Sequence, residues 1–160
     1  MWKAEDSVRY RKPLKFVGGV AVALRAMPED VQYVFGQALM AAQYGDVVPN
    51  ARPFGEGVSR DVLKLIEDDD GETYRAAFVI AFDGVVYLFD VFQKKSTSGI
   101  ATLRPDVDRV KARYQAAKQD YAANKALYLA ATAAAKAEAE QKARATDASS
   151  ARTNKRSKKP

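Results

Sequence analysis

The sequence predicts an α+β fold: a small antiparallel sheet with helices packed on one face, followed by a long C-terminal helix. Three short apolar segments, residues 61–66, 73–82 and 85–92, have the length and composition of strands. The pairs Asp70-Gly71 and Asp83-Gly84 separate these segments, and Asp-Gly favours tight turns between antiparallel strands. Apolar residues at helical spacing lie before and after this region, which predicts flanking helices.

The region before these strands predicts one more strand and two helices. Residues 12–17 form a short strand candidate, and residues 20–27 a short helix. Pro28-Glu29-Asp30 suits the first turn of a longer helix. Residues 46–59 contain two prolines and two glycines without a clear period, so we expect a loop. The longer helix presents one apolar stripe, made of Val31, Val34, Phe35, Ala38, Leu39 and Ala42.

A long helix is expected from Pro105 and Asp106 onward. Its apolar positions alternate spacings of three and four, although alanine and tyrosine fill most of them instead of leucine and isoleucine. We expect the first turns to pack on the sheet and an alanine-rich helix to continue to about Ala145. The positions of this seam are Val107, Val110, Tyr114, Ala117, Tyr121, Asn124, Tyr128, Ala131 and Ala135.

The charge of the chain is concentrated at its C-terminal end. The net charge is +6, and residues 141–160 carry seven basic side chains against one acid, Asp147. The remainder is therefore balanced, and the basic character does not by itself indicate that the folded part binds nucleic acid. Four regions follow: a flexible leader (1–11), a compact domain (12–115), an alanine-rich helical extension (116–145) and a disordered basic tail (146–160).

Composition limits the chemistry that this chain can perform. It has no cysteine and no histidine, which excludes thiol nucleophiles, disulfides and the commonest general base. The N-terminal residues do not resemble a signal peptide, and no apolar run is long enough to span a bilayer, so we expect a cytoplasmic protein. No metal or other cofactor is expected.

Charged residues interrupt the apolar strands at a few positions. Lys64, Arg75 and Lys94 lie on the three strands, and strict alternation would place Val86, Leu88, Asp90, Phe92 and Lys94 on one face of the last strand. A free sheet face with cations and an aromatic ring suits a phosphate chain with stackable bases. Such a face could support phosphodiester cleavage, with a lysine of lowered pKa as the base.

A simpler interpretation stands beside this one. A few charges on an exposed sheet are more often a solvated surface than an active site. Asp90 and Arg75 could form only a cross-strand ion pair. The acidic run before Gly71 favours a solvated turn, and Gly55-Glu56-Gly57 lacks the strand–loop–helix context of a phosphate-binding loop.

Several motifs resemble those of the phage-derived HigB-like toxins in the RelE/ParE superfamily. A Thr-Tyr-Arg strand, a hairpin and then Phe-Gln-Lys-Lys-Ser are the most specific of these motifs. The likeness covers residues 12–114. The matching segments are Ala23-Leu-Arg-Ala-Met-Pro-Glu29, Ala51-Arg-Pro-Phe54, Leu65-Ile-Glu-Asp-Asp-Asp-Gly-Glu-Thr-Tyr-Arg75, Val91-Phe-Gln-Lys-Lys-Ser96 and Gly99-Ile-Ala-Thr102.

The resemblance implies a ribosome-dependent mRNA endonuclease that needs no metal, neutralised by a cognate helix-turn-helix antitoxin. By position, Arg75 resembles the arginine that contacts the scissile phosphate, and Lys94 and Lys64 resemble strand cations of the site. The implied RNA contacts are Gln93, Lys95, Phe92, Tyr74 and Asp90. Two alternatives remain open: a non-catalytic binding protein with this fold, and a gyrase inhibitor of the ParE kind. The long helix could also mediate self-association.

Overall fold

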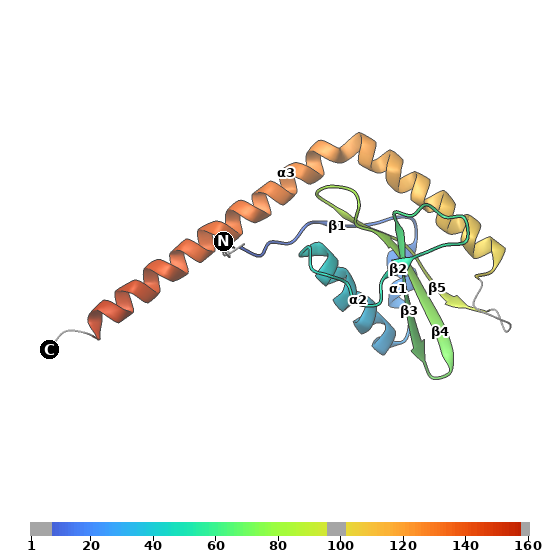
Figure 1. Ribbon diagram of the computed structural model, residues 1–160, viewed down its shortest axis with the longest axis horizontal. Helices are drawn as coiled ribbons and strands as arrows, with labels where there is room; N and C mark the ends of the chain where they lie inside the picture. The colour runs from blue at the N-terminus through green and yellow to red at the C-terminus, as the bar shows by residue number, and fades with distance from the viewer. Residues whose placement is uncertain (1–7, 96–101, 158–160) are drawn as a thin grey trace, which may run out of the picture.

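The computed structural model describes residues 8–95 and 102–157 (Figure 1). The predicted α+β class is confirmed: helices pack on a five-stranded sheet with the strand order β1-β5-β4-β3-β2. The elements are β1 (Leu14–Phe16), α1 (Val20–Arg25), α2 (Glu29–Gln43), β2 (Arg52–Pro53), β3 (Val62–Asp69), β4 (Glu72–Val79), β5 (Val86–Lys94) and α3 (Arg104–Arg156).

Strands β3, β4 and β5 form the predicted antiparallel meander. Asp70 and Gly71 both have positive φ and close the β3–β4 hairpin as a two-residue turn, as predicted. The second turn differs from the prediction, because residues 80–85 connect β4 to β5 and Asp83-Gly84 occupies only part of that loop. The sheet is also not purely antiparallel, since β1 pairs with β5 in parallel.

One extra residue in β5 interrupts its alternation. Ala77 pairs with Asp90, whereas the next residue of β4, Phe78, pairs with Leu88, so Phe89 is a β-bulge. Leu88 therefore packs with α1 and α2, while Phe89 and Phe92 pack with α3. The expectation that Leu88, Asp90 and Phe92 share one face was wrong for this reason.

Helices cover both faces of the sheet, not one. The predicted stripe of α2, including Val31, Phe35 and Leu39, is buried with α1 against one face. The first half of α3 buries Val107 and Tyr114 against the other face, where Val79 and Tyr87 meet them. The expectation that the first turns of this helix pack on the sheet is confirmed, but the seam did not indicate that they cover the face opposite α1 and α2.

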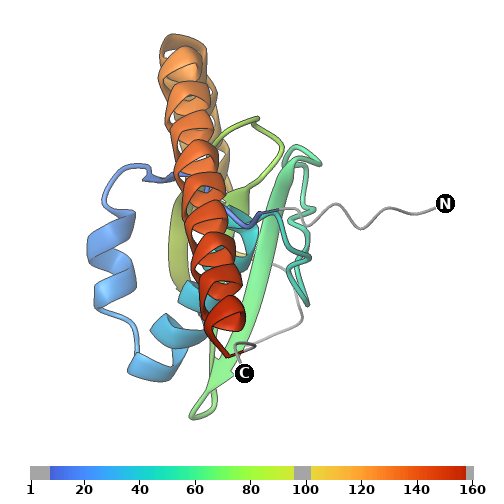
Figure 2. The ribbon, with the colours of Figure 1, turned by 90° about the vertical axis from the view of Figure 1, so that its left-hand side faces the viewer.

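Helix α3 has no break at the expected boundaries. It runs to Arg156, so the part of the tail that we expected to be disordered, residues 146–156, is helical. Its last buried residue is Tyr128. Figure 1 shows that α3 bends above the sheet and that its second half extends away from the domain, and Figure 2 shows this half from its end. None of the helices in the described ranges is long and apolar enough to cross a membrane.

Tyrosine side chains hold α3 against β5 and against the β4–β5 loop. The hydroxyls of Tyr87 and Tyr128 donate to Asp120 over 2.6 Å and 2.5 Å. Burial alone would raise the pKa of Asp120, but these hydrogen bonds outweigh it and lower that pKa. Burial raises the pKa of Tyr87 well above its usual value. The ring of Phe82 stacks between those of Tyr114 and Tyr121, with centroids 6.2 Å and 4.8 Å away. The loop and the helix are therefore one packed unit.

We predict that Gly84→Ala lowers the free energy of unfolding more than Gly71→Ala does. Both glycines have positive φ, so alanine strains each of them. Only at Gly84 would a Cβ lie 3.0 Å from Leu129 Cδ2, whereas the space around Gly71 is open. Urea unfolding should show an additional loss of about 1–3 kcal/mol for Gly84→Ala. Equal losses of unfolding free energy in the two variants would contradict the close contact between α3 and the loop that contains Gly84.

Candidate nucleic-acid interface

Four cations from four strands gather on the face of the sheet that α3 partly covers. Lys64 stands opposite Ala77, and Arg75 stands opposite Phe92, two residues further along the sheet. Lys94 follows at the next position of this face, opposite Thr73. Arg52, on β2, pairs with Lys64. We call Arg52, Lys64, Arg75 and Lys94 the basic cluster.

The cluster alters the ionisation of Lys64. Burial lowers the pKa of Lys64, and the charges of Arg75, Arg52 and Lys94 lower it further. The carboxylate of Glu56 acts in the opposite direction. The Lys64 ammonium lies 5.8 Å from the centre of the Phe54 ring, which is fully buried. This lysine therefore holds its proton less tightly than an exposed lysine does.

A loop glutamate joins the basic cluster. Glu56 has a φ of 54°, rare for a residue other than glycine, and lies between Gly55 and Gly57. Its Oε1 accepts a hydrogen bond of 2.5 Å from the backbone N–H of Thr102. Glu56 is not among the residues predicted for the site, because a Gly-Glu-Gly tripeptide in a loop does not show which strand it will face.

Arg75 is almost completely buried, with 2% of its surface exposed. It lies on β4 between Ile66 and Phe92. One of its guanidinium nitrogens, Nη1, donates to the hydroxyl of Thr102, just before α3 begins. Thr102 therefore contacts both the guanidinium of Arg75 and the carboxylate of Glu56. The planar orientation of Arg75 is therefore fixed by its surroundings.

Asp90 orients the first turns of α3. Its side chain is 2% exposed and accepts hydrogen bonds of 2.8 Å from Arg109 and Arg113. Burial raises the pKa of Asp90, and the two arginines oppose this rise. Arg109 also binds Asp106 and lies over the ring of Phe92, 5.4 Å from its centre. Asp90 thus places a further cation, Arg109, beside the aromatic ring that neighbours Arg75.

The cross-strand pairing of Asp90 with Arg75, which the sequence left open, does not occur in the register of the sheet. Asp90 stands opposite Ala77, because the bulge at Phe89 shifts β5 by one residue. Its carboxylate is bound from α3. Asp90 is therefore a buried anchor of the helix in the structure.

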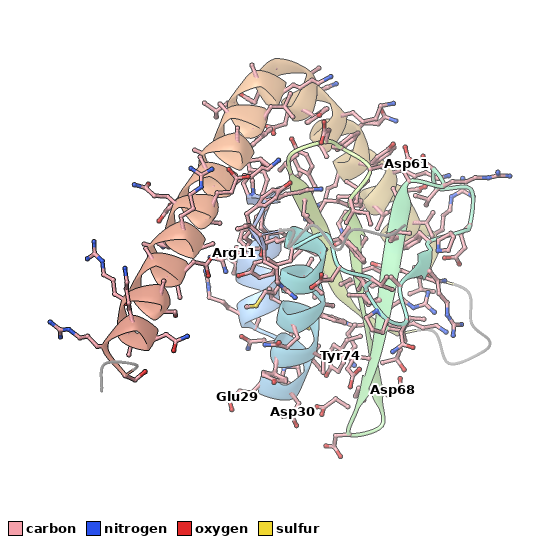
Figure 3. The ribbon with its side chains drawn as sticks, turned by 60° about the vertical axis from the view of Figure 1, so that its left-hand side comes forward. Arg11, Glu29, Asp30, Asp61, Asp68 and Tyr74 are labelled. Carbon is pink, nitrogen blue, oxygen red and sulfur yellow. The ribbon has the colours of Figure 1, made fainter. Side chains whose placement is uncertain are left out.

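Two of the candidate RNA contacts lie on the opposite face. Tyr74 is buried in the core with α1 and α2, and Figure 3 shows it on the side of the sheet where α2 lies. Gln93 pairs with Tyr74 and donates a hydrogen bond of 2.5 Å to Glu72. Lys95 is exposed beyond the end of β5. Residues 96–101, which carry the Gly-Ile-Ala motif, lie outside the described residues, and Thr102 is the part of that motif with a known position.

No group of three or more acidic side chains in residues 8–95 and 102–157 is arranged to hold a metal ion. In the acidic run at the end of β3, Asp68 accepts a hydrogen bond of 2.7 Å from Thr73 across the hairpin.

We predict that Asp90→Asn destabilises the fold, because it leaves Arg109 and Arg113 without their buried counter-charge. Both arginines are partly exposed, so the expected loss of unfolding free energy is about 2 kcal/mol, below the full cost for a buried pair. Asp108→Asn is the matched control, since Asp108 forms an exposed pair with Arg104 and should cost about 0.5 kcal/mol or less. Urea unfolding of both variants measures the difference, and equal losses would contradict the anchoring role.

Comparison with known proteins adds a family to this geometry. Residues 23–115 match the model of one protein family, which is described as phage derived protein Gp49-like (DUF891). This match extends from α1 into α3, covers more than half of the chain and includes all four residues of the basic cluster. A search of curated proteins and a search of solved structures both find no significant match. The chain therefore belongs to the family of phage-derived Gp49-like proteins.

Proposed function

We propose that this protein is a toxin of the HigB-like kind that cleaves messenger RNA on the ribosome, using the face that bears the basic cluster. The observation that carries the proposal is the assembly of Lys64, Arg75 and Lys94 beside one carboxylate, Glu56. Membership of a phage-derived family and the motif resemblance support it. A cytoplasmic location, a ribosomal partner and a helix-turn-helix antitoxin are parts of the same proposal.

The proposed reaction is an intramolecular displacement on RNA. A base removes the proton of a 2′-hydroxyl, whose oxygen attacks the adjacent phosphorus. The bond from phosphorus to the 5′-oxygen breaks, which leaves a 2′,3′-cyclic phosphate, and the 5′-oxygen takes up a proton. The partly exposed Lys94 would stabilise the negative charge that grows on the phosphate oxygens, and the buried Arg75 would add its positive charge from beneath the surface.

Two groups of the cluster are suited to act as the base. Lys64 has a lowered pKa, so a larger share of its amine is neutral than in an exposed lysine. Glu56 is a carboxylate held next to the cations, and its strained backbone is typical of functional positions. The buried, oriented guanidinium of Arg75 distinguishes this face from an ordinary solvated surface, where arginines are mobile.

We predict that Lys64→Ala combined with Lys94→Ala abolishes growth arrest on induced expression. Both side chains are only partly buried at the sheet surface, so the fold should persist. Lys118→Ala with Lys125→Ala, two exposed lysines of α3, is the control for loss of charge. Primer extension should find cuts within translated messages for the native protein and for the control only. Full toxicity of the cluster variant would contradict the site.

Arrest without RNA cuts would instead support gyrase inhibition, and the absence of any toxicity from the native protein would support a non-catalytic binding protein. DNA-damage signalling distinguishes the first of these outcomes. Both would overturn the proposed nuclease activity.

The pH dependence of cleavage should identify the base. If Lys64 is the base, the rate rises with pH through its lowered pKa, and Lys64→Arg is inactive because a guanidinium stays protonated. Glu56→Gln removes a charge that raises this pKa, so the rising limb should move to lower pH. If Glu56 is the base, Glu56→Gln is inactive at every pH. Single-turnover cleavage on stalled ribosomes measures both profiles.

A further inference from the structure

The second half of α3 is an exposed helical arm that lies outside the buried core of the domain. We call residues 130–156 the C-terminal arm. The structure shows no buried residue in it, and a helix of this length extends about 40 Å. Only its base is held, where the hydroxyl of Thr132 donates to the carbonyl of Gly84 over 2.8 Å. Figure 1 shows that the arm points away from the end of the sheet where β5 leads into α3.

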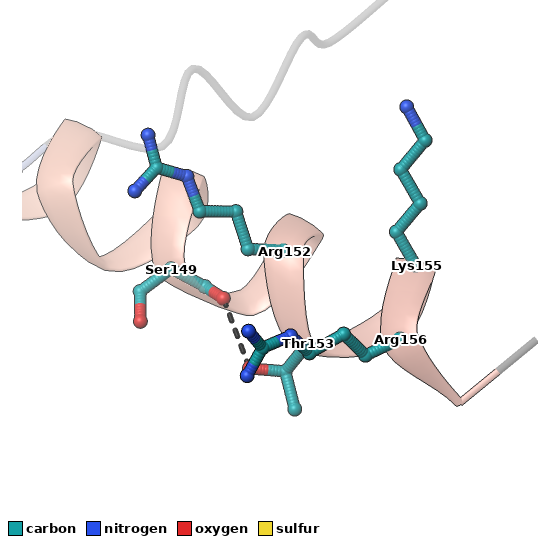
Figure 4. Close-up of a pocket in the computed structure, with 5 residues that line it drawn as sticks. All are labelled: Ser149, Arg152, Thr153, Lys155 and Arg156. Carbon is teal, nitrogen blue, oxygen red and sulfur yellow. Dashed lines mark hydrogen bonds between the residues drawn. The ribbon is translucent and has the colours of Figure 1, made fainter.

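The tip of the arm carries positive charge alone. Asp147 is the last acidic residue of the chain, and Lys158 and Lys159 follow the helix. Arg152, Lys155 and Arg156 are spaced by three and four residues, which places them on one side of the helix. With Ser149 and Thr153 they line an open crevice (Figure 4). The Thr153 hydroxyl donates to the backbone carbonyl of Ser149 over 3.1 Å, so the tip offers two guanidinium groups, an ammonium group and the hydroxyl of Ser149 in two helical turns.

The composition of the arm excludes two other binding partners, a membrane surface and a second copy of the chain. Its apolar residues are all alanine, so it lacks the bulky side chains that bury a helix in a membrane interface. The same lack removes the seam that a coiled coil with a second copy requires. A favourable helix dipole accounts for cations in the last turn, Lys155 and Arg156, but not for Arg152 one turn earlier.

We propose that the tip of the C-terminal arm is a second, sequence-independent RNA-binding surface that contacts the phosphate backbone. Guanidinium, ammonium and hydroxyl groups are the donors that proteins use on phosphate oxygens. The choice of RNA over DNA rests on the proposed function, since both offer the same phosphate chemistry. Because the arm extends away from the sheet, its tip binds a different part of the RNA from the basic cluster and holds the protein on a long or folded RNA.

The test compares full-length proteins with a labelled single-stranded oligonucleotide long enough to span the arm, carrying 2′-O-methyl groups so that it cannot be cleaved. One variant combines Arg152→Gln, Lys155→Gln and Arg156→Gln, since glutamine keeps helix propensity. The control combines Arg11→Gln, Arg25→Gln and Lys125→Gln, which removes the same charge from exposed positions elsewhere. A DNA of the same sequence and vesicles containing phosphatidylserine are the competing ligands.

We expect the arm variant to bind the oligonucleotide roughly tenfold more weakly at low salt, and its slope of log Kd against log salt to fall by about 2, the value for three lost phosphate contacts on a single strand. The control should retain the native Kd. An unchanged Kd and slope in the arm variant would overturn the proposal. Tighter arm-dependent binding to the DNA or the vesicles than to the RNA would overturn the assignment to RNA.

The same assay separates this inference from the proposed function. Lys64→Ala with Lys94→Ala should leave the contribution of the arm intact. If the native protein cuts no message but the arm variant still loses affinity for RNA, the nuclease proposal fails and the arm proposal stands.

Discussion

The bulge at Phe89 is the constraint on which the arrangement of the site depends. If the same sequence formed a regular strand without the bulge, Asp90 would face α1 and α2 together with Leu88. With it, Asp90 faces α3 and binds Arg109 and Arg113, which sets where α3 begins. The start of α3 in turn places Thr102 on Arg75 and on Glu56. A single inserted residue therefore links the sheet, the helix and the cluster, as bulges next to functional sites often do.

The two faces of the sheet have different roles. One face buries α1 and α2 and carries the apolar packing that holds the strands in register. The other is covered by α3 only in part, which leaves Lys64 and Lys94 partly exposed beside the buried Arg75. Partial burial is what lowers the pKa of Lys64 while leaving the cations within reach of a phosphate. A fully solvated cluster would not have this property, and a fully covered one could not bind RNA.

The sequence predicted the parts of this structure that depend on local patterns. The meander from β3 to β5, the Asp70-Gly71 turn and the buried stripe of α2 follow from periodicity and turn chemistry. The bulge leaves no mark in a strand where apolar residues occupy both faces, so Val86 and Leu88 were grouped with Asp90 and Phe92. Tyr74 and Gln93 became candidate RNA contacts through the family resemblance, which does not show the face on which each lies. Glu56, Thr102 and Arg109 reach the site from two loops and a helix, contacts that no local pattern encodes. The seam of α3 predicted that its first turns pack on the sheet, but it did not indicate which face they cover.

The proposal that RNA binds at the basic cluster is tested most directly by mapping which residues of the folded domain contact RNA. Nuclear magnetic resonance of the isotope-labelled protein, titrated with a 2′-O-methyl oligonucleotide, reports this residue by residue. We expect the largest shifts at Lys64, Arg75 and Lys94, with Tyr74 unchanged on the opposite face. Shifts confined to the face of α1 and α2, or to the C-terminal arm alone, would contradict it.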